Sequence, residues 1–218
     1  MSQSDFIGSL RYLLNKSFLV EIEDSCKTVS LVEKSNIGKK KKLPPNTPTD
    51  FLTYLHFSNV DNAVVINHDL VHCLGIQNLA TLGKGVVKTC DAIILGIDND
   101  EPYILILDMK STSLDIEQNY RKMKCGKVFI ELLDTYLEHF QEYYKSYESI
   151  RGWKHYYLIC HNNVSKKETK IGIDPLIISN DFLSPTYLYV EDNSTLSLTE
   201  LINPPTPILS SSTAPSRN

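Results

Sequence analysis

Two apolar runs separated by a short polar turn form the clearest pattern in this 218-residue chain. Ala92–Ile97 and Tyr103–Leu107 flank the pair Asn99-Asp100. Asn and Asp tolerate the backbone conformations of two-residue β-turns, so the segment predicts a β-hairpin with this pair at the centre of its turn. Runs that are apolar at nearly every position are typical of strands covered on both faces of a sheet.

The register of this hairpin places three charged residues at its open end. With the turn centred as above, Asp91 faces Asp108, and residues that face each other across a strand pair have Cβ atoms about 5 Å apart. Lys110 lies two residues beyond Asp108 and therefore projects from the same face of the strand. We expect two carboxylates and one ammonium group to converge at one end of an apolar hairpin.

This cluster predicts a metal site. Two buried carboxylates repel each other, so one must be protonated or both must bind a cation. Mg²⁺ prefers carboxylate oxygens, keeps several waters and uses substrate phosphates as further ligands. We therefore expect Asp91 and Asp108 to bind Mg²⁺, for which Mn²⁺ would substitute. Lys110 would position or activate the attacking water and stabilise charge on a phosphate.

The pattern Asp91…Asp108-Met109-Lys110 resembles the active-site motif of the PD-(D/E)XK nuclease superfamily. Members carry an Asp at the start of one strand and a (D/E)-x-K at the end of the next, and Cys90 stands where the motif has a proline that many members replace. The resemblance implies a metal-dependent nuclease that hydrolyses phosphodiester bonds, with DNA favoured over RNA. It leaves restriction, phage defence and repair open as the biological role.

The sequence around the motif is more informative than the three residues of the motif itself. A second (D/E)-x-K, Glu168-Thr-Lys170, follows no apolar strand, and we interpret it as a solvated loop. Three alternatives to the nuclease stay open. In the first, the charged cluster is a salt-bridged hairpin end on the surface. In the second, the chain is a catalytically inactive scaffold or partner subunit with the same fold. In the third, the chain is an unrelated α/β binding module.

The resemblance implies a mixed central β-sheet flanked by helices, the restriction-endonuclease-like core with the order αβββαβ, and it covers roughly residues 5–161. The order of elements that the hydrophobic pattern predicts agrees with this core. A long helix follows the motif, with an apolar stripe that includes Phe129, Leu132 and Tyr136. The expected helices are Asp5–Leu14, Pro48–Phe57 and Leu114–Tyr147, and the further strands are Ser17–Glu23, Thr28–Val32, Asn62–Asn67, Tyr156–Cys160, Ile171–Ile178 and Tyr187–Val190. We expect a loop over Lys39–Thr49 and leave Val71–Leu82 unassigned.

The length favours one nuclease domain over residues 1–202, followed by a disordered tail, rich in Pro, Ser and Thr, over residues 203–218. The net charge of −4 argues against a uniformly basic surface but permits local basic clusters. Arg121, Lys122 and Lys124 follow the motif closely, and we expect them to contact nucleic-acid phosphates.

Several other residues are candidates for the site. Gln118 and Glu21 are possible accessory groups, with helix surface and exposed strand as their alternatives. His68, His72 and Cys73 faintly suggest zinc, although a fourth ligand is lacking. His161 follows the strand after the long helix and would approach the site from the side, or would be a hydrogen-bonded boundary residue.

The five cysteines form no Cys-x-x-Cys pair, and neither a membrane span nor a secretory signal is evident. We therefore expect free thiols and a cytoplasmic location, with no membrane partner. A small nuclease with little recognition apparatus would act on nucleic acid as a homo-oligomer or in a complex with a helicase or sensor protein.

Overall fold

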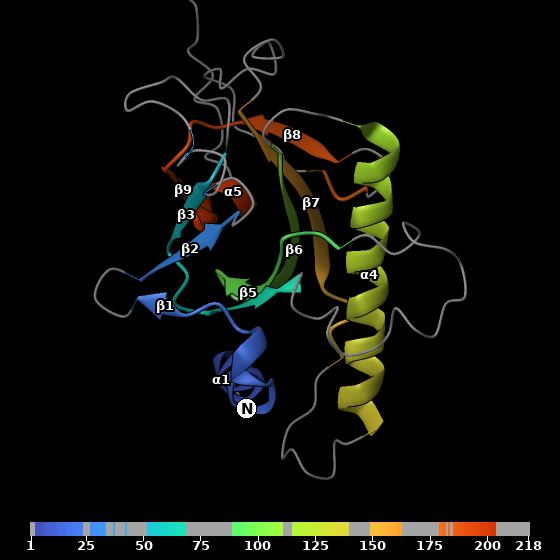
Figure 1. Ribbon diagram of the computed structural model, residues 1–218. Helices are drawn as coiled ribbons and strands as arrows, with labels where there is room; N and C mark the ends of the chain where they lie inside the picture. Colours follow the sequence, from blue (N-terminus) through green and yellow to red (C-terminus); the bar gives the residue numbers. More distant parts are fainter. Residues whose placement is uncertain are drawn as a thin grey trace, which may run out of the picture.

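Within the described residues of the computed structural model, a five-stranded mixed sheet lies between two layers, with the helices α1 and α4 on one face and a second sheet with the short helix α5 on the other (Figure 1). The structure is thus mixed α/β, as the sequence predicts. It describes residues 3–23, 27–33, 37, 42, 52–68, 89–110, 115–139, 149–162, 179–181, 183 and 185–203.

The central sheet combines antiparallel and parallel pairs. Its strands in spatial order are β4 (Ala63–Asn67), β5 (Ala92–Asp98), β6 (Glu101–Lys110), β7 (Lys154–His161) and β8 (Thr186–Tyr189). β4, β5 and β6 are antiparallel neighbours, whereas β6, β7 and β8 run parallel. The long helix α4 (Ile116–His139) lies between β6 and β7 in the chain, and a helical crossover is the usual way to join parallel strands.

The second sheet is smaller, with four strands in the part of the chain that the structure describes. They are, in spatial order, β1 (Ile22–Glu23), β2 (Thr28–Val32), β3 (Tyr54–Ser58) and β9 (Ser194–Ser197). The other elements in the described ranges are α1 (Gln3–Leu13), the 3₁₀ turn η1 (Lys16–Phe18) and α5 (Leu198–Ile202). None of the helices in the described ranges is both long and apolar enough to span a bilayer.

Both faces of the central sheet are buried, which explains the continuous apolar runs. Along β6, Leu105 and Leu107 pack into the core shared with the second sheet. The alternate residues Ile104 and Ile106 pack into the core beneath α1 and α4. Asp108 and Lys110 have the same parity as Ile104 and Ile106, so the period of a strand places them on the helix-covered face.

Helix α4 packs closely against this face. Gly126 is buried, and a Cβ atom at this position would lie 2.7 Å from Cγ2 of Ile106. The predicted apolar stripe is partly wrong, because Leu132 and Tyr136 are 47% and 55% exposed. The buried apolar residues of α4 are Met123, Ile130, Leu133 and Leu137.

Two element predictions are also wrong. Tyr54–Ser58 is a strand where a helix over Pro48–Phe57 was expected, because its alternate residues are buried between β2 and β9. Within Ser17–Glu23 only Ile22–Glu23 is a strand, since Asn15 caps a 3₁₀ turn just before it. The expectations for residues 38–41, 43–49, 71–82, 140–147, 171–178 and 204–218 lie outside the described residues.

Candidate active site

The hairpin of β5 and β6 has the register that the sequence predicts. Asn99 and Asp100 form its turn with φ angles of 49° and 62°. The left-handed conformation at both residues matches the two-residue turns that suit twisted strands. The paired residues run from Asp98 opposite Glu101 to Ala92 opposite Leu107, so Asp91 and Asp108 follow at the open end.

Asp91 lies just beyond the last pair and contacts the residues on both sides of Asp108. Its backbone N–H donates to the carbonyl oxygen of Leu107 at 3.0 Å, and its carboxylate accepts a hydrogen bond from the backbone N–H of Met109. The pKa of the Cys160 thiol is raised by burial and by the charges of both aspartates. The charges of both aspartates thus act on the same neighbouring thiol, as expected if the two acids lie at one site.

Asp108 is completely buried and is held between two lysines. Its Oδ2 lies 2.9 Å from Nζ of Lys110, and its Oδ1 accepts a hydrogen bond from Nζ of Lys122 at 2.6 Å. The two lysine side chains are only 13% and 15% exposed. Ion pairs taken out of water in this way contribute little net stability, so their presence favours a functional role.

Lys122 comes to this cluster from the second turn of α4. Burial lowers the pKa of its ammonium group, but the charges of Asp108 and Asp91 outweigh burial and leave the pKa above its ordinary value. The group is therefore positively charged at neutral pH. Sequence reasoning expected Lys122 to contact nucleic acid and did not foresee its bond to Asp108. The available signal was its spacing from the accessory candidate Gln118, since residues four apart share a helix face.

Buried polar side chains surround the cluster. His161 is completely buried opposite Lys110 on β7, and its ring centroid lies 5.9 Å from that of Tyr189. Asn119 and Asn162 are also buried, and among the described residues no group hydrogen-bonds to the Oδ1 atom of either amide. The parallel register thus places His161 beside Lys110 of the motif, and its role in the site stays a prediction.

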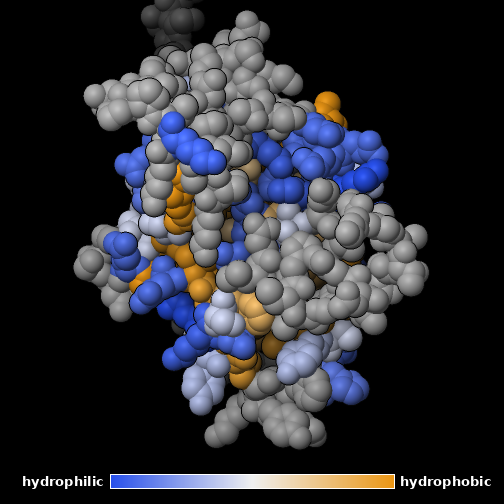
Figure 2. All heavy atoms as spheres, viewed as in Figure 1, coloured by the Kyte–Doolittle hydropathy of each residue, from blue (hydrophilic) through white to orange (hydrophobic). Residues whose placement is uncertain are grey.

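The other basic residues at the start of α4 point away from the acids. Arg121 forms an ion pair with Glu117 at 2.5 Å, and Nζ of Lys124 lies 6.0 Å from the ring centroid of Tyr120. Figure 2 shows hydrophilic side chains gathered around the end of the molecule where α4 begins. This surface is accessible to a charged ligand, and its contact with nucleic acid stays a prediction.

The two accessory candidates differ in position. Gln118 is half-buried one helical turn before Lys122, on the side of α4 that approaches the site. Glu21 is exposed, and the bridge between Leu19 and Ile66 carries its segment along β4 away from Asp91. By strand geometry Glu21 lies roughly 13 Å along the sheet from the acids, so the structure does not bring it to the cluster.

The residues suggested for zinc are not assembled in the described part of the chain. Nδ1 of His68 lies 3.0 Å from Sγ of the buried Cys90, and His72 and Cys73 lie outside the described residues. No three His, Cys, Asp or Glu side chains converge on one point within the described ranges.

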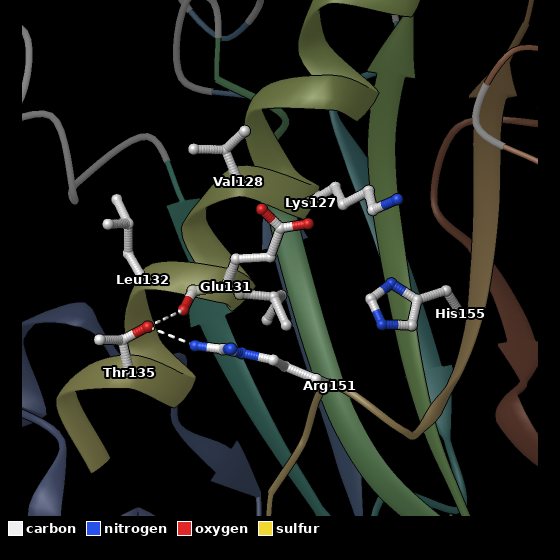
Figure 3. Close-up of a pocket in the computed structure, with 8 residues that line it drawn as sticks. Lys127, Val128, Glu131, Leu132, Thr135, Arg151 and His155 are labelled. Atoms are coloured by element: carbon white, nitrogen blue, oxygen red, sulfur yellow. Dashed lines mark hydrogen bonds between the residues drawn. The ribbon is translucent and has the colours of Figure 1, made fainter. Parts of the chain in front are cut away.

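A separate cavity of about 550 Å³ lies between α4 and the beginning of β7, away from the acids (Figure 3). Lys127 and Glu131 on α4 and His155 on β7 line it, and Arg151 reaches Thr135 across it. Strand β7 extends six residues from His155 to His161, about 20 Å. The cavity is therefore not part of the acid and lysine cluster.

Comparisons with known proteins give little guidance on the family. No family model matches the chain, and no solved structure matches it. A glutamate 5-kinase of Alkaliphilus oremlandii (strain OhILAs) is 28% identical over 147 residues, which are 64% of this chain and 52% of the kinase. The chain thus spans about half the length of the curated relative that it matches. A likeness of this extent does not assign the chain to the kinase family.

Proposed function

We propose that this protein is a Mg²⁺-dependent nuclease of the PD-(D/E)XK type that hydrolyses phosphodiester bonds. The observation that supports this proposal most strongly is that Asp108 is fully buried at the open end of the hairpin and forms ion pairs with two lysines. Asp91 forms hydrogen bonds with the residues on both sides of Asp108. A buried carboxylate with three partly buried charged groups around it, at the end of an apolar sheet, has a functional explanation if the four groups act on a charged substrate.

The arrangement of elements supports the restriction-endonuclease-like core as part of this proposal. Helix α1, the antiparallel strands β4, β5 and β6, helix α4 and the parallel strand β7 occur along the chain in the order αβββαβ, with η1 and the second-sheet strands β1, β2 and β3 inserted between α1 and β4. The motif residues lie at the end of β6, beside the end of its parallel neighbour β7. Ligands bind preferentially at the ends of strands in sheets with helical crossovers.

The donor set fits a hard divalent cation. Oδ2 of Asp108 is buried and receives no hydrogen bond from any described group, although the Lys110 ammonium lies 2.9 Å away. Mg²⁺ is commonly held by one or two carboxylates with waters and substrate phosphates, so Asp91 and Asp108 would suffice. When bound, the ion would lower the pKa of a ligated water and neutralise charge on the phosphate.

The side chains of the site would have separate roles in the reaction. Asp91 is fixed by the N–H of Met109, and Asp108 by the strand itself, so the two carboxylates would hold their positions. Lys110 would orient the attacking water or stabilise the extra negative charge of the pentavalent phosphate. The hydrophilic surface at the start of α4 would carry the phosphate backbone, with Arg121 and Lys124 as its basic groups.

The proposal extends to the biological setting only by resemblance. We propose DNA in preference to RNA, and a role in restriction, phage defence or repair. The partners would be a second copy of the chain, a helicase or a sensor protein. The three cysteines within the described residues, Cys90, Cys125 and Cys160, are free thiols, which agrees with a reducing compartment such as the cytoplasm.

A cleavage screen tests the nuclease. The purified protein is incubated with plasmid DNA, single-stranded DNA and RNA in Mg²⁺, Mn²⁺ or EDTA. We expect cleavage of at least one substrate with either metal and none with EDTA, and loss of cleavage by Asp108→Ala and Lys110→Ala. Cleavage by both variants would rule out a nuclease site at Asp108 and Lys110, because a contaminant or another site would then be responsible.

The alternatives make different predictions in the same screen. An inactive scaffold would bind nucleic acid without cutting it under any metal condition. The similarity to a glutamate 5-kinase raises phosphoryl transfer as a second candidate, since acids and lysines also handle phosphates in that chemistry. Consumption of ATP that depends on glutamate, without cleavage of any nucleic acid, would favour the kinase.

A further inference from the structure

Lys122 occupies Oδ1, one of the two oxygens of Asp108 that a metal ion could bind. Its Nζ lies 2.6 Å from Oδ1 and donates a hydrogen bond to that oxygen, while Lys110 lies 2.9 Å from Oδ2. Mg²⁺ requires an oxygen lone pair at about 2.1 Å. The Lys122 ammonium group competes with the ion for Oδ1, and the Lys110 ammonium group lies beside Oδ2. Each oxygen of Asp108 therefore already has a cation beside it.

Among the residues that the structure describes, the formal charges of the cluster balance without a metal. Asp91 and Asp108 contribute two negative charges, and Lys110 and Lys122 contribute two positive charges. A divalent cation added to this buried set would leave it with a surplus of positive charge in a region of low effective dielectric. An arriving phosphate group is an anion, and it would both offset the surplus and offer Lys122 a new partner.

Lys122 is better placed to change partners than Lys110. It lies on α4 between the exposed residues Arg121 and Lys124, at the hydrophilic end of the helix. Its side chain has a flexible four-carbon stem that can move the ammonium by several ångströms without moving the helix. Lys110 ends the strand that carries Asp108, and its backbone carbonyl accepts a hydrogen bond from Asn162 at 3.4 Å.

We propose that Lys122 gates the metal site and that a bound phosphate opens the gate. In the protein alone its ammonium group occupies Oδ1 of Asp108. In the complex it would bind a phosphate oxygen of the nucleic acid and release Oδ1 to the metal. Metal and nucleic acid would therefore bind cooperatively, and this inference rests on the proposed nuclease function.

The first test measures Mn²⁺ binding in the absence of nucleic acid, by titration calorimetry and by the electron paramagnetic resonance signal of the free ion. Lys122→Met and Lys122→Gln should each bind Mn²⁺ roughly tenfold or more tightly than the wild type, because the competing charge is gone. Lys127→Met is the matched control, because Lys127 lies on the same helix but lines the cavity away from the acids, and it should leave the Mn²⁺ affinity unchanged. Circular dichroism melts in EDTA establish that each variant is folded.

The second test asks whether nucleic acid opens the gate. Lys110→Ala keeps both acids and, under the proposed function, does not cleave, so Mn²⁺ binding can be measured with a DNA oligonucleotide present. The oligonucleotide should raise the Mn²⁺ affinity of Lys110→Ala several-fold. It should have no such effect when Lys122→Met is added to that variant.

The outcomes separate this inference from the nuclease assignment. Equal Mn²⁺ affinity in the wild type and both Lys122 variants would overturn the gate, whether or not the wild type cuts DNA. Tighter binding by the variants would support the gate even if the wild type cuts nothing, and the nuclease assignment would then fail alone. If none of these proteins binds Mn²⁺, both fail.

Discussion

A single carboxylate, that of Asp108, connects the strand, the helix and the proposed chemistry. Its two oxygens contact Lys110 from its own strand and Lys122 from α4. The first contact could be predicted from sequence because residues two apart share a strand face. The second could not, because it depends on where α4 lies over the sheet. Local spacing thus identifies the motif but not its partner from the helix.

His155 provides a pH test at the residue scale. Burial and the charge of Lys127 lower the pKa of its imidazole below the ordinary value. Between the lowered pKa and the ordinary value of about 6.5, the unfolded chain binds more protons than the folded chain. The free energy of unfolding should therefore fall as the pH is lowered through this window.

The measurement combines an NMR titration of the His155 ring with urea unfolding between about pH 5 and 8. His155→Gln should remove this part of the pH dependence while leaving the remainder unchanged. A measured pKa at or above the ordinary histidine value would contradict the burial and the nearby positive charge that the structure assigns to this ring.

At the scale of elements, the sequence predicts the hairpin well and the second sheet poorly. The turn chemistry of Asn99-Asp100 and the two apolar runs fix the register of β5 and β6 locally. In contrast, β3 and β9 lie far apart in sequence yet pair in parallel, with Leu55 opposite Ser194. No local periodicity encodes such a partner, which explains why a helix was expected over Pro48–Phe57.

The hairpin turn predicts a stabilising substitution. Asp100 has a φ of 62°, in the left-handed region where glycine is favoured over other residues. Asp100→Gly should therefore raise the free energy of unfolding by up to about 1 kcal/mol, and Asp100→Ala should lower it. Urea unfolding of the three proteins gives the comparison. Equal stability of the Gly and Ala variants would contradict the left-handed turn.

The contact between α4 and β6 predicts an unusual response to alanine. Alanine is normally about 1 kcal/mol better than glycine inside a helix. At Gly126 the added Cβ would lie 2.7 Å from Ile106, so Gly126→Ala should instead destabilise the protein by about 1–3 kcal/mol. Gly8, in α1, has nothing within 4 Å of an added Cβ and serves as the control.

Urea or thermal unfolding of both glycine variants checks this contact. Gly8→Ala should be neutral or stabilising, because α1 gains helix propensity without a clash. If Gly126→Ala were as stable as Gly8→Ala, α4 would lie farther from the sheet than described, and the bond between Lys122 and Asp108 would lose its structural support.

At the scale of the whole molecule, two apolar cores on opposite faces of one sheet set the position of the site. They bury the central strands almost completely, and polar side chains appear where β5, β6 and β7 reach one end of the sheet. The mixed α/β class follows from the order of the apolar segments. The function does not follow from the fold, since one fold supports many activities, and it must be tested at the site.

The most direct test is the single-turnover rate of DNA cleavage as Mg²⁺ is titrated, for Asp91→Asn and Asp108→Asn beside Asp100→Asn. Asp100 belongs to the same hairpin but lies eight residues from Asp108 along β6, about 26 Å away. We expect each site variant to lose at least roughly 10³-fold in rate and the control to keep the wild-type rate. Wild-type rates in both site variants would contradict the account.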